Sequence, residues 1–141
     1  MRTLLFVFTL FLSSLLFAQD NSTELLAIQY YQNNDFEKAS ILFEELFEGD
    51  PGSEIFYHYY LDCLINLTEF NVAEKMIKKQ IKRFPNKNIL AVDLGYVYSL
   101  MGDERKKKKQ YAEVVENVNA NPTAVSMLAN AFIQRKEFEY A

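Results

Sequence analysis

The feature that most constrains the fold of this chain is a period of about 34 residues, which begins near residue 20 and runs through the remaining sequence. Positions one period apart carry side chains of one class, except at Glu104, Lys107 and Asn119, and the register does not slip. The clearest columns are Ala27, Leu61, Gly95 and Ala129; Tyr30, Leu64, Tyr98 and Phe132; and Phe43, Ile77 and Tyr111. Periods of about 20 to 50 residues are typical of proteins built from stacked structural repeats. The period therefore predicts a repeat architecture.

The pattern within each period resembles the tetratricopeptide repeat, a helix–turn–helix unit of about 34 residues. That repeat places a small residue in its first helix with a large one three positions later. Its second helix has a small residue followed by an aromatic, and a proline ends the unit. The first period carries this pattern as Ala27, Tyr30, Ala39, Phe43 and Pro51. The resemblance implies an all-α fold, an α-solenoid of tetratricopeptide repeats wound into a right-handed superhelix.

The resemblance divides the chain into repeats at about 20–53, 54–87, 88–121 and 122–141, the last of them truncated. The third repeat departs from the pattern, because Lys107 occupies a small-residue position and Asn119 the proline position. Hydrophobic spacing, turn residues and helix caps predict helices over 22–33, 36–49, 54–67, 70–84, 88–101, 104–118 and 122–135. An eighth helix is expected to begin near Phe138.

A core between these helices follows from the pattern. Small residues let two helix axes approach, and large residues on the same helix faces fill the space around the contact. The residues expected to build this core are Ala27, Tyr30, Phe36, Ala39, Phe43, Leu61, Leu64, Phe70, Ala73, Ile77, Gly95, Tyr98, Tyr111, Ala129, Phe132 and Phe138. Each helix pair leaves one apolar side open and is expected to stack on the next pair. The uncapped C-terminal repeat is therefore a predicted site of self-association.

Residues 1–18 have the layout of a cleavable signal peptide. Arg2 supplies a positive start, residues 4–12 form a nearly continuous apolar run, and small Ala18 precedes polar Gln19. The competing interpretation is an uncleaved membrane anchor, although the stretch is short for a bilayer span of about 20 residues. We expect cleavage after Ala18 and an exported protein, periplasmic or secreted, with the bacterial envelope as its setting. Membrane association after cleavage is not indicated.

In the family that the chain resembles, the first helix of each repeat lines a concave groove that holds a peptide or helix of a partner protein. The resemblance implies groove positions at Glu24, Ile28, Tyr31, Ile55, His58, Asp62, Ile65, Ile89, Val92, Tyr96, Ser99, Ser126, Asn130 and Ile133. This set contains no Lys or Arg, which favours an apolar partner segment over a partner's C-terminal carboxylate. For Tyr31 and Tyr96, packing against a neighbouring repeat is the alternative interpretation.

Residue types that carry chemistry are sparse. His58 and Cys63 are the only histidine and cysteine, and they lie five positions apart, on different faces of one predicted helix. A metal site of these residue types needs more ligands than two, and a lone cysteine forms no disulfide within the chain. We find no phosphate-binding loop or nucleophile motif. The sequence therefore predicts neither an enzyme nor a cofactor.

Charge is distributed unevenly along the chain. Residues 19–62 hold ten acids and one base, a net charge of −9, whereas residues 63–109 hold five acids and eleven bases, a net charge of +6. The bases gather on the predicted second helices, at Lys75, Lys78, Lys79, Lys82, Arg83 and 105–109. They indicate either a patch for an acidic partner, an anionic lipid surface or a second copy, or a solvated helix face. Nucleic acid is not expected, because the chain has a net charge of −4 and no aromatics among these bases.

Two functional hypotheses follow. The first is a non-enzymatic scaffold that binds a peptide or helix of other proteins in the groove, outside the cytoplasm. The alternative is an N-terminal input module of a longer sensor or enzyme, whose kinase, cyclase or hydrolase part would lie beyond residue 141. The pattern predicts the fold more sharply than the function, because one fold serves many functions.

Overall fold

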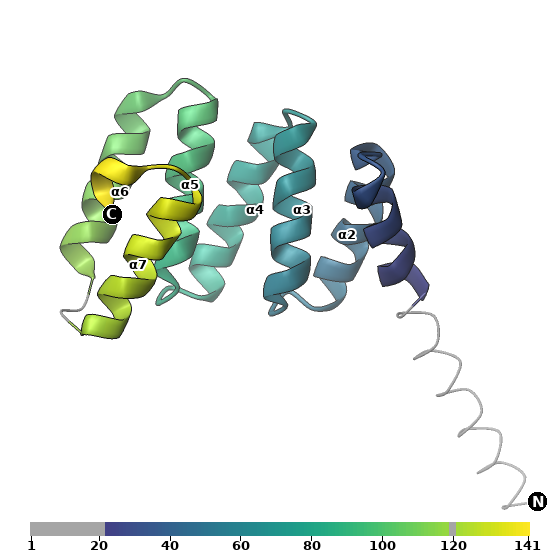
Figure 1. Ribbon diagram of the computed structural model, residues 1–141, viewed down its shortest axis with the longest axis horizontal. Coiled ribbons are helices and arrows are strands. Elements are labelled where there is room, and N and C mark those ends of the chain that lie inside the picture. Colours follow the sequence, from purple (N-terminus) through teal and green to yellow (C-terminus); the bar gives the residue numbers. More distant parts are fainter. Residues whose placement is uncertain (1–21, 119–120) are drawn as a thin grey trace, which may run out of the picture. The chain divides into compact units, whose positions relative to one another are not determined.

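The computed structural model describes residues 22–118 and 121–141. The predicted signal peptide lies outside the described residues, as does Asn119. Within the described residues all regular structure is helical, and none of their helices combines the length and apolar character that a membrane crossing requires. The described residues form two compact units, one within residues 22–68 and one within residues 69–141, which are described separately (Figure 1).

The described part of the first unit contains a helix over residues 22–32, α2 (Phe36–Gly49) and α3 (Glu54–Asn66). Helix α2 begins where the Asp35 side chain accepts a hydrogen bond from the backbone N–H of Lys38, and Ser53 caps α3 in the same way. Such caps satisfy backbone donors that have no partner inside the helix. The predicted boundaries of these helices are confirmed to within one residue.

The core of the first unit is built from residues three or four positions apart. Ala27, Ala39 and Phe43 are completely buried, and α2 packs along α3. The ring of Phe43 stacks on that of Tyr59, with 4.7 Å between the centroids. Small Ala27 and Ala39 thus admit the close helix contact that the repeat pattern predicts, and the aromatic rings fill the space beside it.

The second unit contains α4 (Phe70–Arg83), α5 (Asn88–Leu100), α6 (Glu104–Asn117), α7 (Pro122–Gln134) and a short 3₁₀ helix, η1 (Phe138–Tyr140). Helix α5 is central, because it contacts α4, α6 and α7 (Figure 1). Its sequence is apolar nearly all round, which is what a helix with neighbours on several sides requires. Gly102 allows the tight turn into α6, since its φ of +75° suits glycine.

At Gly95 the ring of Tyr111 on α6 packs directly against the backbone of α5. A Cβ atom at this position would lie only 2.0 Å from Cε1 of Tyr111, so the ring occupies the space that any side chain would need. Tyr111 is completely buried and belongs to a core formed with Val92, Val114, Leu128, Ala131 and Phe132. The absence of a side chain at position 95 therefore has a direct steric cause.

The predicted core residues are not equally buried. Most are buried, but the side chains of Tyr30, Phe36, Phe70 and Ala129 are only half-buried. The prediction for Phe138 is wrong, because its side chain is 68% exposed. The expected eighth helix is a single 3₁₀ turn, and Tyr140 takes the packing role, with its ring 4.8 Å from that of Tyr111.

Lys107, which breaks the small-residue column, is accommodated by a charge. Its Nζ lies 2.9 Å from Oε2 of Glu137, and only 12% of either side chain is exposed. The Glu137 carboxylate raises the pKa of Lys107, so the ammonium is stabilised where it lies. The lysine that departs from the repeat pattern is thus paired with the carboxylate of Glu137, which directly precedes η1.

Candidate partner-binding surface

The predicted groove residues of the first unit lie on the helix over residues 22–32 and on α3. Their spacing of three and four positions places them on one face of each helix. None of them is buried, and Ile55 is 61% exposed. We call this set the first-unit surface; it consists of Glu24, Ile28, Tyr31, Ile55, His58, Asp62 and Ile65.

Tyr31 ties the two helices of this surface together. Its hydroxyl donates a hydrogen bond of 3.4 Å to Oδ2 of Asp62, and its ring meets that of Tyr59 edge-on at 4.8 Å. Partial burial, followed by the Asp62 carboxylate, raises the pKa of the Tyr31 hydroxyl. The packing interpretation of Tyr31 therefore holds in the structure, while its half-buried ring still borders the surface.

The predicted groove residues of the second unit divide between two helices. Ile89, Tyr96 and Ser99 on α5 are half-buried, while the α7 residues are exposed. Val92 is a wrong prediction, because it is completely buried in the core shared by α5, α6 and α7. Helix α7 packs against α5, and Val92 lies within that contact. We call the rest the second-unit surface: Ile89, Tyr96, Ser99, Ser126, Asn130 and Ile133.

An arginine borders this second-unit surface, contrary to the expectation of a surface without cations. The guanidinium of Arg135 lies over the Tyr96 ring, 5.0 Å from its centroid. Its Nη2 and Nε both contact Oδ1 of Asp93, at 2.7 and 2.8 Å. The side chain of Asp93 is only 2% exposed. Arg135 thus joins α7 to α5 and neutralises a buried carboxylate.

The sequence contains a signal for this pair. Asp93 is a single acid within an otherwise apolar α5 segment, ILAVDLGYVY. A buried carboxylate needs a cation or several hydrogen-bond donors to offset the loss of water. The sequence alone does not identify the partner of Asp93, because Arg135 is 42 residues away along the chain. The two side chains come together only when α7 packs against α5.

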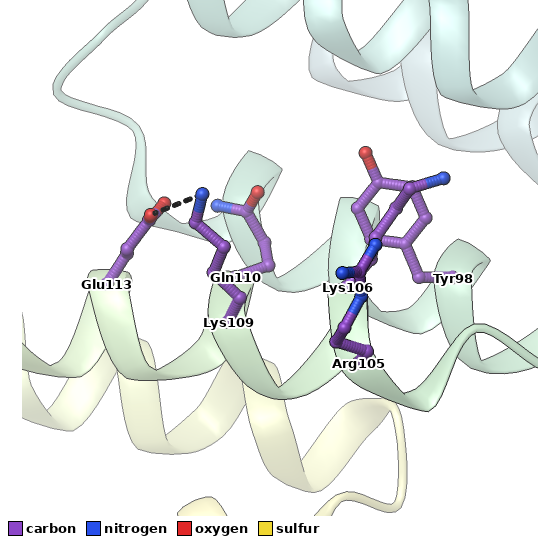
Figure 2. Close-up of a pocket in the computed structure, with 6 residues that line it drawn as sticks. All are labelled: Tyr98, Arg105, Lys106, Lys109, Gln110 and Glu113. Atoms are coloured by element: carbon purple, nitrogen blue, oxygen red, sulfur yellow. Dashed lines mark ion pairs between the residues drawn. The ribbon is translucent and has the colours of Figure 1, made fainter.

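A hollow beside α6 in the second unit is lined by three cationic side chains and one carboxylate. Figure 2 shows its lining, with Lys109 directed toward Glu113, whose carboxylate oxygen is 3.8 Å from Nζ. The ammonium of Lys106 lies 5.2 Å from the centroid of the Tyr98 ring. The hollow has a volume of about 410 Å³ and is lined by Tyr98, Arg105, Lys106, Lys109, Gln110 and Glu113. None of these residues belongs to the second-unit surface.

The described residues contain neither a metal-site cluster nor a reactive cysteine. They contain no cluster of three His, Cys, Asp or Glu side chains with metal-site geometry. Burial, with a smaller contribution from Asp62, raises the pKa of the Cys63 thiol to about 12. The thiol is therefore protonated at neutral pH, and its side chain is completely buried. A nucleophile requires the thiolate and access to substrate.

Comparison of the fold with solved structures gives several matches. PcrH from Pseudomonas aeruginosa matches with a TM-score of 0.63 and 14% sequence identity, over 86% of this chain and 92% of PcrH. PcrH in complex with the chaperone binding region of PopD matches with a TM-score of 0.60 and 14% identity, over 84% of this chain and 90% of that one. MamA (AMB-1) matches with a TM-score of 0.56 and 18% identity, over 75% of this chain and 58% of MamA.

No family model matches the chain, and no curated protein matches it by sequence. At these identities the likeness concerns the fold and leaves the function open. PcrH and MamA are tetratricopeptide-like helical repeat proteins. The chain therefore has a tetratricopeptide-like helical repeat fold.

Proposed function

We propose that this chain is a non-enzymatic protein-binding module, which takes up an apolar segment of a partner protein on the first helices of its repeats. The observation that carries the proposal is that apolar residues at repeat-equivalent positions of these helices keep part of their surface accessible to water. Ile55 on α3 is 61% exposed, and Ile89, at the same position one repeat later on α5, is half-buried against the core of α5, α6 and α7. Apolar side chains that stay partly accessible at recurring positions favour contact with another molecule.

The chemistry of the two surfaces supports an apolar partner segment with a few polar groups. Isoleucines supply the apolar area, and the half-buried rings of Tyr31 and Tyr96 supply rigid contact area. Because the Arg135 charge is already directed at Asp93, the second-unit surface has a polar rim but little excess positive charge. PcrH in complex with a region of PopD is an instance of this fold holding part of another protein.

The binding proposal is tested by selecting partners from a phage-displayed peptide library on the purified chain and measuring the affinity of the best peptide by fluorescence anisotropy. Ile55→Asn is expected to weaken binding about tenfold, because it places a polar group in an apolar contact. The matched control is Val115→Asn on α6, which changes an exposed apolar residue, 44% accessible, outside both surfaces.

Equal affinities for wild type, Ile55→Asn and Val115→Asn would place the peptide elsewhere and contradict the proposal. A selection that yields no binding peptide would contradict it as well. Circular dichroism of each variant shows that the helices are intact. Both substituted side chains are largely exposed, so neither change opens a cavity in the core.

We also propose that the module works outside the cytoplasm. The support is the sequence of residues 1–18, whose layout is that of a signal peptide. Expression of the full gene in a bacterial host, followed by fractionation and N-terminal sequencing, tests this. The proposal expects a periplasmic or secreted product that starts at Gln19. A cytoplasmic product that retains residue 1 would refute it.

A further inference from the structure

Structurally equivalent positions on α2 and α4 carry opposite charges. The two helices are the second helices of the first and second repeats, and their sequences align with a shift of one repeat. At the equivalent outer positions, Glu44, Glu45 and Glu48 on α2 correspond to Lys78, Lys79 and Lys82 on α4. All six side chains belong to exposed residues. The same helix face is therefore acidic in one repeat and basic in the next.

The acidic face of α2 has little compensation within the described chain. Glu44 accepts a hydrogen bond of 2.7 Å from the hydroxyl of Tyr60. Among the described residues, no cation lies within ion-pair distance of Glu45 or Glu48. Ile41, one turn before Glu45, is 65% exposed. We call Ile41, Glu44, Glu45 and Glu48 the acidic stripe.

The basic face of α4 is the counterpart. Lys78 is paired with Glu74, whose Oε1 lies 2.6 Å from its Nζ. Within residues 22–118 and 121–141, no carboxylate lies within ion-pair distance of Lys75, Lys79 or Lys82. Val72, one turn before Lys75, is 38% exposed. We call Lys75, Lys78, Lys79 and Lys82 the basic stripe.

We propose that the acidic stripe of one copy of this chain docks on the basic stripe of a second copy. The stripes have the same helical spacing and opposite charge. Each also has an exposed aliphatic residue: Ile41 is part of the acidic stripe on α2, and Val72 lies next to the basic stripe on α4. Facing stripes would pair charges that lack ion-pair partners within one described chain. The aliphatic residues would add a small apolar contact that fixes the register.

The charges of the two units favour a second copy over other occupants. Residues 22–68 hold nine acids and one base, a net charge of −8, while residues 69–141 hold nine acids and thirteen bases, a net charge of +4. An anionic lipid surface would attract the basic stripe but would leave the acidic stripe without a partner. Other copies of the chain can supply partners for both stripes, one copy for the acidic stripe and another for the basic stripe, and complementary charges also guide the encounter of two molecules.

The contact is expected to be weak and sensitive to salt. Exposed ion pairs contribute little individually, and added salt screens them. For the purified protein, in the form that its host produces, light scattering at about 50 mM salt should give an average mass above that of one chain. At about 500 mM salt, where the screening length is a few ångströms, the average mass should approach that of one chain.

Two charge-reversed variants make the test specific. In the first, Glu45→Lys and Glu48→Lys give the acidic stripe a net charge of +1, so that both stripes are basic. In the second, Lys75→Glu, Lys79→Glu and Lys82→Glu give the basic stripe a net charge of −2, so that both stripes are acidic. Each variant alone should be monomeric at low salt, because its stripes repel those of a second copy. An equimolar mixture should associate again, since the basic stripe of one variant meets the acidic stripe of the other. Recovery in the mixture also shows that both variants are folded.

The control is Glu113→Lys with Glu116→Lys, which changes the equivalent positions of α6. This variant should associate as the wild type does. A wild type that is monomeric at low salt, or a mixture that stays monomeric, would overturn the proposal. Binding of a monomeric wild type to vesicles containing phosphatidylglycerol, lost in the Lys75→Glu, Lys79→Glu, Lys82→Glu variant, would also overturn it and assign the basic stripe to a lipid surface.

Discussion

At the scale of single residues, Gly95 is the position where the repeat pattern and the packing agree most directly. Gly95→Ala would drive a Cβ into the ring of Tyr111, at 2.0 Å from Cε1. Overpacking of a filled core of this kind costs about 1–3 kcal/mol, although alanine is the better helix former. We expect chemical denaturation to show a loss of unfolding free energy in that range.

The control for this change is Gly49→Ala in α2. A Cβ at Gly49 meets no atom within 4 Å, so the substitution should leave the unfolding free energy unchanged or slightly higher. Equal destabilisation by both substitutions would mean that the contact with Tyr111 does not explain why position 95 is a glycine.

The Asp93–Arg135 pair gives a second prediction. Arg135→Ala removes the guanidinium that lies 2.7 Å from a carboxylate with a 2% exposed side chain. Removal of one partner of a buried ion pair typically costs about 3–5 kcal/mol, because the remaining charge loses its compensation. Lys38→Ala, which removes an exposed partner of Asp35, should change the denaturation midpoint little. Similar midpoints for the two variants would contradict this account of the second unit.

Cys63 provides a pH-dependent probe of the first unit. Burial raises the pKa of its thiol to about 12, above the value of about 8.5 for an exposed thiol. The folded state therefore holds its proton more firmly, and this contribution to stability is present below pH about 8.5 and is lost as pH rises toward 12. Iodoacetamide at pH about 8 should label Cys63 slowly in the native protein and rapidly in denaturant. Equally rapid labelling in both would show that Cys63 is not buried.

At the scale of elements, helix boundaries were predictable because the caps are local. Ser53 accepts a hydrogen bond from the Phe56 N–H at 3.3 Å and fixes the start of α3. Ser53→Ala should lower the unfolding free energy by about 1 kcal/mol. Glu69→Ala is the matched control, since the side chain of Glu69 makes no capping hydrogen bond to α4. An equal loss in both variants would show that the cap does not stabilise α3.

The errors of the sequence-based interpretation arise from contacts between elements. Val92 has the spacing of a surface residue on α5, but the packing of α7 buries it. Phe138 has the repeat position of Phe36 and Phe70, but the 3₁₀ turn places Tyr140 on the Tyr111 ring instead. Arg135 has no local signal at all, because only the folded second unit brings it to Asp93. The period determines which helix faces pack. The burial and contacts of these three residues depend instead on which residues of other elements pack against them.

At the scale of the whole molecule, the first and second helices of the repeats have separate proposed roles. The first helices present apolar and aromatic side chains to a partner segment. The second helices carry the charges that distinguish the first unit from the second. Because the two proposed contacts use different helix faces, a charge-reversed variant should still bind the selected peptide with wild-type affinity. If anisotropy measurements showed that a charge-reversed variant also binds the peptide more weakly, the two contacts would be coupled.

The central claim is that partner segments bind on the first helices of the repeats. Hydrogen–deuterium exchange, read by mass spectrometry with and without the selected peptide, tests it most directly. We expect slower exchange in residues 22–32, α3, α5 and α7, with little change in α2, α4 and α6. Slower exchange confined to α2, α4 and α6 would contradict the claim and assign binding to the second helices.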